Sequence, residues 1–173
     1  SALRMSNIKN YKYDWIWEKT TSTWFLNSKK QPMRCYENIC IFYNSQPTYN
    51  PIKTQWHERK ISKASHKINS IKTENYWSHW LTTYDSTERY PRQVLKMKND
   101  KQECALHPTQ KPVALIEYLI KTYTNEWETV LDFTMWSWTT WVACVNTNRN
   151  FIGIELDDKY LKVASDRINN EHQ

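Results

Sequence analysis

Two acids and three hydroxyl residues near the end of the chain have the types and spacing of a cofactor site. Asp132 ends an apolar run, and Glu155 ends the next apolar run 23 residues later. An acid at about this offset binds ribose hydroxyls in dinucleotide folds. Ser137, Thr139 and Thr140 stand where a helix is expected to begin, and free amides there favour an anionic group such as a carboxylate. These residues predict a site for a nucleotide-type cofactor, with a plain β-α-β core element as the alternative.

Tryptophan stands where such a loop needs glycine. The chain has ten tryptophans and one glycine, Gly153, against roughly 12 glycines at an average usage of about 7%. Seven of the tryptophans have polar or turn-forming neighbours and no evident packing role. They are Trp24, Trp56, Trp77, Trp127, Trp136, Trp138 and Trp141. Read as glycine, they would leave eight glycines and three tryptophans, which are ordinary totals.

Three of the seven, Trp136, Trp138 and Trp141, fall in the loop itself. Glycine there would permit positive φ and a close approach of the backbone to a ligand. As tryptophan, each side chain buries roughly 150–250 Å², and the three are expected to fill the cofactor cleft. We therefore hypothesise that the source reads the codon UGA as glycine and that the translation supplied tryptophan. Random mutation would have placed other residue types at these positions.

The elements around the loop alternate between strand and helix. Residues 129–133 and 151–154 are predicted as buried strands, with residues 139–148 as the helix between them. Asp157 is predicted to cap a last amphipathic helix, and Pro112 suits the first position of an earlier one. A β-α-β-α order implies a parallel sheet with a right-handed crossover, so the fold class is α/β.

Two further strands are predicted in the first part of the chain. Residues 9–18 form one, with its aromatic side chains on one face, and residues 37–43 form the other. Residues 20–35 are predicted as a loop. From 44 to 103 the chain is polar and basic, and its persistent aromatics favour an irregular insertion over disorder. The aromatic face of the first strand consists of Tyr11, Tyr13, Trp15 and Trp17.

Composition narrows the class of protein. The net charge of +6 and pI near 9.1 favour a polyanionic partner, although charge alone does not separate nucleic-acid binding from an ordinary basic surface. No apolar run reaches roughly 18 residues and no signal-peptide pattern opens the chain, so we expect a cytoplasmic protein without membrane contact. The four scattered cysteines are expected to be reduced thiols, and no metal site is expected. The start at Ser1 suggests a fragment.

Six motifs in a fixed order resemble the amino-group DNA methyltransferases, in the class whose catalytic region precedes the cofactor motif (the beta order). They are 13–19 (Tyr-Asp-Trp-Ile-Trp-Glu-Lys), 34–39 (Arg-Cys-Tyr-Glu-Asn-Ile), 88–92 (Glu-Arg-Tyr-Pro-Arg), 106–112 (Leu-His-Pro-Thr-Gln-Lys-Pro), 132–140 and 153–155 (Gly-Ile-Glu). The resemblance covers nearly the whole chain. It implies a Rossmann-like S-adenosylmethionine-dependent methyltransferase sheet with an irregular target-recognition insertion.

The same resemblance implies S-adenosylmethionine as the cofactor and assigns residues to it. Asp132, Phe133 and the loop would contact its adenosine and methionine parts, and Glu155 its ribose. The amino-acid end of S-adenosylmethionine would lie near His107, Thr109 and Lys111, which precede the helix predicted from Pro112. The loop residues are Thr134, Ser137, Thr139 and Thr140.

The resemblance also divides the chain. Residues 1–43 would be part of the catalytic region, 44–105 the target-recognition region, and 106–173 the cofactor-binding β-α-β-α region. The family's Asp-Pro-Pro-Tyr motif, which holds a flipped-out base, is absent and would precede residue 1. No catalytic residue is therefore named, and this chain alone is expected to be inactive.

The segment 44–105 is expected to meet DNA phosphates through basic side chains, although residue by residue a solvated basic surface is the competing interpretation. These side chains are Lys53, Arg59, Lys60, Lys63, Lys67, Lys72, Arg89 and Arg92.

The expected function is site-specific methyl transfer from S-adenosylmethionine to the N6 amine of adenine in flipped-out duplex DNA, with cytosine N4 as the second choice. The expected partner is double-stranded DNA, and a restriction endonuclease is a candidate partner. Two other interpretations stay open. One is a catalytically inactive DNA-binding remnant of such an enzyme. The other is an S-adenosylmethionine enzyme acting on RNA or protein, against which the motif order counts.

Overall fold

The computed structural model describes residues 1–62, 84–98, 111–135 and 138–158. It divides into two compact units, one of Ser1–Asn50 with Arg92–Gln173 and one of Pro51–Pro91. Some sequence predictions fall outside the described residues. They are His107, Thr109, Ser137, Trp77, Trp136, Lys63, Lys67, Lys72 and the helix after Asp157.

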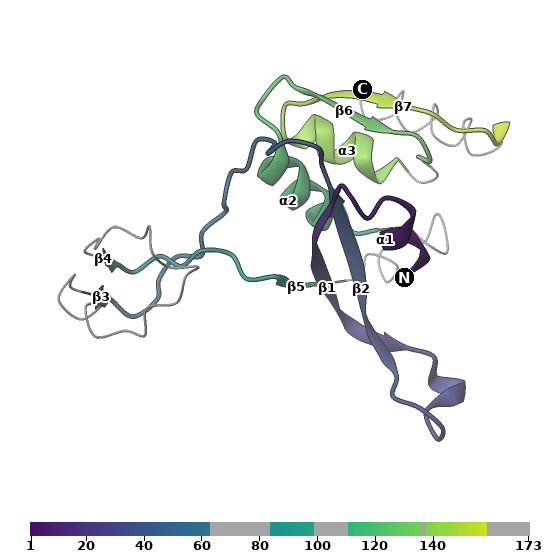
Figure 1. The fold of residues 1–173 in the computed structure, drawn as a ribbon, viewed down its shortest axis with the longest axis horizontal. Coiled ribbons are helices and arrows are strands. Elements are labelled where there is room, and N and C mark those ends of the chain that lie inside the picture. Colours follow the sequence, from purple (N-terminus) through teal and green to yellow (C-terminus); the bar gives the residue numbers. More distant parts are fainter. Residues whose placement is uncertain (63–83, 99–110, 136–137, 159–173) are drawn as a thin grey trace, which may run out of the picture. The chain divides into compact units, whose positions relative to one another are not determined.

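A three-stranded sheet of order β2-β1-β5 organises the first unit (Figure 1). Its long middle strand β1 (Tyr11–Thr23) pairs antiparallel with β2 (Arg34–Phe42) and parallel with β5 (Val94–Met97). A short helix, α1 (Ala2–Ser6), precedes β1. Both strands predicted in this part of the chain are confirmed, and each is longer than predicted.

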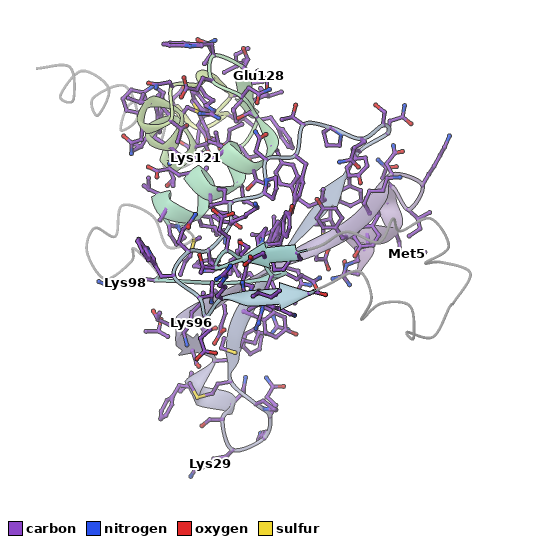
Figure 2. All side chains as sticks on the ribbon, turned by 90° about the vertical axis from the view of Figure 1, so that its left-hand side faces the viewer. Met5, Lys29, Lys96, Lys98, Lys121 and Glu128 are labelled. Carbon is purple, nitrogen blue, oxygen red and sulfur yellow. The ribbon has the colours of Figure 1, made fainter. Side chains whose placement is uncertain are left out.

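The loop predicted at residues 20–35 is shorter than expected. Strand β1 continues to Thr23, which still pairs with Arg34, because the run of threonine and serine after Lys19 suits extended backbone. Only the turn remains, and it contains a 3-10 helix, η1 (Phe25–Asn27). Lys29 marks the tip of this β1–β2 connection in Figure 2.

Three of the four residues predicted on the aromatic face of β1, Tyr13, Trp15 and Trp17, belong to the core of the first unit. Tyr11 does not, because the register shifts between Tyr11 and Tyr13 and the Tyr11 ring lies beside Arg4. Trp15 and Trp17 are buried with Leu95 of β5 and with Leu115 of helix α2 (Val113–Tyr123). Each indole N–H has an acceptor, because Trp15 Nε1 donates to the Tyr123 hydroxyl over 2.6 Å and Trp17 Nε1 donates to the Met97 carbonyl over 3.1 Å. Pro112, predicted as the first helical residue, stands instead at the N-cap, and α2 begins one residue later at Val113.

A parallel β-α-β unit follows α2, as predicted. Strands β6 (Thr129–Asp132) and β7 (Asn150–Gly153) pair in parallel, and helix α3 (Thr139–Asn146) connects them. Val130 and Phe151 pack against Ile120, Ala143 and Cys144 on the face covered by α2 and α3.

The prediction that these two strands are buried is wrong for one of their faces. Leu131 is 56% exposed and Ile152 is 53% exposed, although both are apolar. Side chains alternate across a strand, so the helices that cover Val130 and Phe151 leave the neighbouring residues on the other face. Among the residues that the structure describes, nothing buries that second face.

The second unit contains two short antiparallel strands, β3 (Lys60–Ser62) and β4 (Tyr84–Ser86), and a bridge between Thr54 and Arg89. The segment 44–105 is thus divided between the units, because β5 belongs to the sheet of the first. Its assignment to target recognition stays a prediction. None of the described helices is long and apolar enough to span a membrane.

The hydroxyl of Tyr123 links α2 to β1, since it also lies 2.8 Å from the Tyr13 hydroxyl. Tyr123→Phe would leave the buried Trp15 Nε1 without an acceptor. We expect a loss of about 1–3 kcal/mol in the free energy of unfolding, measured by urea denaturation. Tyr118→Phe is the matched control, because the Tyr118 ring packs edge-on against Trp15 and its hydroxyl makes no hydrogen bond to the described residues. Equal losses in the two variants would contradict the role given to the Tyr123 hydroxyl.

Candidate cofactor-binding site

The two acids singled out by the sequence lie at the same edge of the β6–β7 pair. Asp132 stands opposite Gly153 in the strand register, and the Ile154 N–H donates to the Asp132 carbonyl over 2.9 Å. The chain after β6 then turns back, and the Met135 N–H donates to the Ile154 carbonyl over 3.2 Å. Glu155 follows directly. In parallel α/β sheets this carboxyl edge is where ligands bind.

Asp132 fixes the loop that leaves β6. Its Oδ1 accepts the Thr134 N–H over 3.0 Å, and its Oδ2 accepts the Thr140 hydroxyl over 2.6 Å. The first bond closes a tight turn, and the second ties the strand end to the first turn of α3. Both carboxylate oxygens therefore hold the loop and the helix N-terminus together.

The other predicted loop residues differ in accessibility. Thr139, the first residue of α3, is 5% exposed, whereas Phe133 is 71% exposed and Thr134 is also exposed. Phe133 thus presents an open aromatic ring beside the loop. The structure brings Asp132, Thr134 and Thr140 into direct contact, while their contacts with a cofactor stay a prediction.

One carboxylate oxygen of Glu155 accepts backbone hydrogen bonds, and the other has no hydrogen-bond partner among the described residues. Its Oε1 accepts the backbone N–H groups of Leu156 and Asp157, each over 2.9 Å. Its Oε2 is buried and has no hydrogen-bond partner among the described residues. A buried carboxylate oxygen without a donor is costly, so a ligand hydroxyl at this oxygen would satisfy it.

The described loop tryptophans do not suit a cofactor cradle. Trp138 occupies the N-cap of α3 with left-handed backbone (φ 57°), and its buried Nε1 has no partner within the described part of the chain. Its ring packs against Met135, Trp141 and Phe151. These rings border a cavity of about 380 Å³ between α3 and β7, which neither Asp132 nor Glu155 lines. Asp132, Glu155 and the loop hydroxyl groups would suit a cofactor bound at the sheet edge. The buried Trp138 side chain would not suit one.

Lys111 has a partner that the sequence did not indicate. Its Nζ donates to Glu37 Oε2 over 2.6 Å and lies 5.7 Å from the ring centre of Trp17. Glu37 on β2 also pairs with Lys19 on β1. Burial alone would raise the pKa of Glu37, but the hydrogen bonds from Lys111 and Lys19 outweigh it and lower that pKa. The Glu37 carboxylate therefore anchors the start of α2 to the sheet.

Several of the basic residues expected to meet phosphates are bound within the second unit. Lys53 pairs with Glu88 over 2.9 Å, and the Arg59 guanidinium makes two 2.7 Å bonds to Asp85. The Arg89 guanidinium donates to the backbone carbonyls of residues 58, 86 and 88, so it supports the fold of this unit.

Of the described basic residues in this set, two remain for an external anion. In the part of the chain that the structure describes, no ion pair is seen for Lys60 on β3 or for Arg92 at the start of the following segment. Sequence alone could not separate these two from Lys53, Arg59 and Arg89, because each of those three has a partner 26 to 35 residues away in the sequence.

Several known proteins are similar to this chain in sequence. A family model described as DNA methylase matches residues 2–166. The type II methyltransferase M.BglI of Bacillus subtilis is 31% identical over 166 residues, covering 91% of this chain and 39% of that protein. The type II methyltransferase M.HpaI of Haemophilus parainfluenzae is 42% identical over 113 residues, covering 65% of this chain and 31% of that protein. The chain thus spans well under half the length of these relatives.

A solved structure described as an M1.HpyAVI–SAM complex is also similar. Its TM-score is 0.62 at 26% sequence identity, and the match covers 98% of this chain and 71% of that one. The arrangement of β1, β2, α2 and the β6-α3-β7 unit therefore has a counterpart in a protein of known structure.

The Glu37 anchor gives a pH-dependent prediction. Because the pKa of Glu37 is lowered in the folded state, its contribution to stability is present above the unfolded value of about 4.3 and is lost as pH falls through the folded value. Glu37→Gln should cost less than about 1 kcal/mol at pH 7, since Lys111 and Glu37 are 44% and 37% exposed.

Urea unfolding of wild type and Glu37→Gln from pH 7 downward would measure this contribution. The two stability curves should converge in acid. Glu126→Gln, in an exposed turn, is the control and should follow wild type at every pH. A constant gap between wild type and Glu37→Gln down to the lowest pH would contradict the anchor.

Proposed function

The chain belongs to the DNA methylase family, and from this premise we propose that it binds S-adenosylmethionine and serves methyl transfer to the N6 amine of adenine in duplex DNA. One observation carries the proposal. Within a family match over residues 2–166, Asp132, its loop and Glu155 meet at the carboxyl edge of a parallel strand pair. Cytosine N4 is the competing acceptor.

The residues at the sheet edge support the choice of cofactor. Glu155 Oε2, which lacks a donor within the described residues, would accept a ribose hydroxyl. Phe133 offers an exposed ring for the adenine base, and the N-terminal end of α3, where the helix dipole favours an anionic group, follows the same loop and would suit the carboxylate. Asp132 would act indirectly, because both of its oxygens already hold the loop. S-adenosylmethionine would supply the methyl group that the amine accepts.

A non-catalytic DNA-binding remnant is the second candidate. One observation favours it: Trp138 is buried at the N-cap of α3, directly after the cofactor loop. Because the sequence contains no adjacent prolines, no residue of this chain is assigned to the flipped-out base.

Methyl transfer by the protein purified from its native source would separate the two candidates. Duplex DNA would be incubated with methyl-labelled S-adenosylmethionine and digested to nucleosides. Labelled N6-methyladenine is the expected product, and labelled N4-methylcytosine would correct the acceptor base. Salt-dependent DNA binding without any label would support the remnant and contradict the proposed activity.

Glu155→Ala tests the assigned ribose contact. A hydrogen bond to a charged group is worth about 1.5–3 kcal/mol, so we expect affinity for S-adenosylmethionine to fall about 10- to 100-fold. Equilibrium dialysis with labelled cofactor would measure it, with the variant introduced into the native gene. Glu126→Ala is the matched acidic control, because Glu126 lies in the exposed turn before β6. Unchanged affinity in Glu155→Ala would remove Glu155 from the site.

Among the described basic residues predicted to meet phosphates, Lys60 and Arg92 have no ion pair, so we infer that these two contact DNA phosphates. Lys60→Ala and Arg92→Ala should each weaken duplex binding for all sequences and reduce the slope of log K against log salt by about 1. Lys53→Ala, whose lysine is held by Glu88, should change the slope less. Fluorescence anisotropy over a salt series would measure the slopes. A larger slope change in Lys53→Ala than in Lys60→Ala and Arg92→Ala would refute the assignment.

A further inference from the structure

Left-handed backbone at residues other than glycine is confined to two residue types in the described part of the chain. Five residues have positive φ: Trp24 (73°), Trp56 (64°), Trp127 (69°), Trp138 (57°) and Asn148 (57°). A Cβ atom crowds the backbone in this region, and only glycine and, less often, asparagine or aspartate occupy it routinely. Asn148 follows the end of α3, where asparagine is a normal substitute for glycine. The four tryptophans have no such explanation.

Trp127 has the positive φ that normally requires glycine at the third position of a type II β-turn. The Glu128 N–H donates to the Asn125 carbonyl over 3.3 Å, so residues 125–128 form a turn with Trp127 in its third position. Positive φ at that position alone is the requirement of a type II turn, which glycine fulfils. The Trp127 ring, which is 70% exposed, does not offset the strain by burial.

Trp24 and Trp56 repeat this combination of strain and exposure. Trp24 precedes the 3-10 helix η1 with φ 73° and ψ 33°, and its side chain is 51% exposed. Its ring lies under the Arg34 guanidinium at 4.8 Å, an exposed contact of small weight. Trp56 is 97% exposed, so its indole has almost no contact with the protein.

Trp138 is buried but poorly accommodated. It combines left-handed backbone at the N-cap of α3 with an indole N–H that lacks an acceptor among the described residues. Glycine is a normal N-cap residue, whereas tryptophan is not among those favoured there. Removing this side chain would open the backbone at the start of α3 to a ligand.

Two other tryptophans show what a native tryptophan looks like in this chain. Trp15 and Trp17 lie in extended backbone, are 4% and 2% exposed, and each donates its N–H to an acceptor. The described residues therefore hold two classes of tryptophan. Neighbours in the sequence place Trp24, Trp56, Trp127, Trp138 and Trp141 in the anomalous class. Backbone conformation, as a separate criterion, selects the first four, whereas Trp141 lies inside helix α3 without positive φ.

We propose that Trp24, Trp56, Trp127 and Trp138 are glycine in the protein as its source makes it, because a UGA codon that the source reads as glycine was rendered as tryptophan. The same decoding applies to Trp77, Trp136 and Trp141, whereas Trp15, Trp17 and Trp80 are encoded tryptophan. The inference does not depend on methyl transfer. It restores a loop whose backbone can approach a ligand closely between Asp132 and α3.

Peptide mass spectrometry of the protein purified from its native source tests the proposal directly. Cleavage after lysine and arginine yields peptides 20–29, 54–59 and 122–149, which contain all four strained positions, and peptide 13–19, which contains Trp15 and Trp17. Glycine is expected in the first three peptides and tryptophan in the fourth. Tryptophan at any of the four strained positions, or UGG codons there, would overturn the proposal.

Thermal unfolding of the protein with tryptophan at all seven positions gives a second test that is independent of the source. Trp127→Gly should raise the Tm by about 2–4 °C, because relief of left-handed strain acts on a domain of this size. Trp127→Ala, which keeps a Cβ in the same conformation, should not raise it. Trp17→Gly should lower the Tm, since it empties the core. A Tm of Trp127→Gly no higher than that of Trp127→Ala would contradict the requirement for glycine.

Discussion

The carboxylate of Asp132 holds the end of β6, the turn at Thr134 and the first turn of α3 in one arrangement. Strands β6 and β7 are parallel, and Asp132 stands opposite Gly153. The turn and helix end held by Asp132 therefore lie at the same sheet edge as Glu155. The site thus depends on a single side chain that binds the protein itself with both oxygens. Its neighbour Glu155, with one oxygen left over, is the residue better suited to a ligand.

The sheet of β1, β2 and β5 depends on polar bonds made by its aromatic core. Trp15 and Trp17 contribute apolar area, but their N–H groups also reach Tyr123 on α2 and Met97 on β5. The Glu37 carboxylate adds a charged link from β2 to Lys111 at the start of the same helix. The helix that leads to the candidate site is therefore fixed to the sheet at both of its ends, by a hydroxyl and by a carboxylate.

The backbone conformation of four tryptophans supports the inference that glycine is encoded at these positions. A glycine-poor chain would be expected to avoid left-handed backbone, yet four tryptophans adopt it here. Three of them are more than half exposed, so neither packing nor hydrogen bonding offsets the strain. With glycine at these positions, the turn before β6 and the loop after it would both have ordinary stereochemistry.

The sequence by itself determined the β-α-β order, most of the aromatic face of β1 and the placement of Asp132 and Glu155 at the ends of neighbouring strands, because side-chain periodicity and the position of an acid at a strand end are local properties. It also identified the seven anomalous tryptophans from composition. Only the tertiary structure decided that Lys111 is bound by Glu37, that Arg59 and Arg89 are held within their own unit, and that one face of β6 and β7 is exposed. Those outcomes depend on residues distant in sequence, and no local pattern encodes which of them meet.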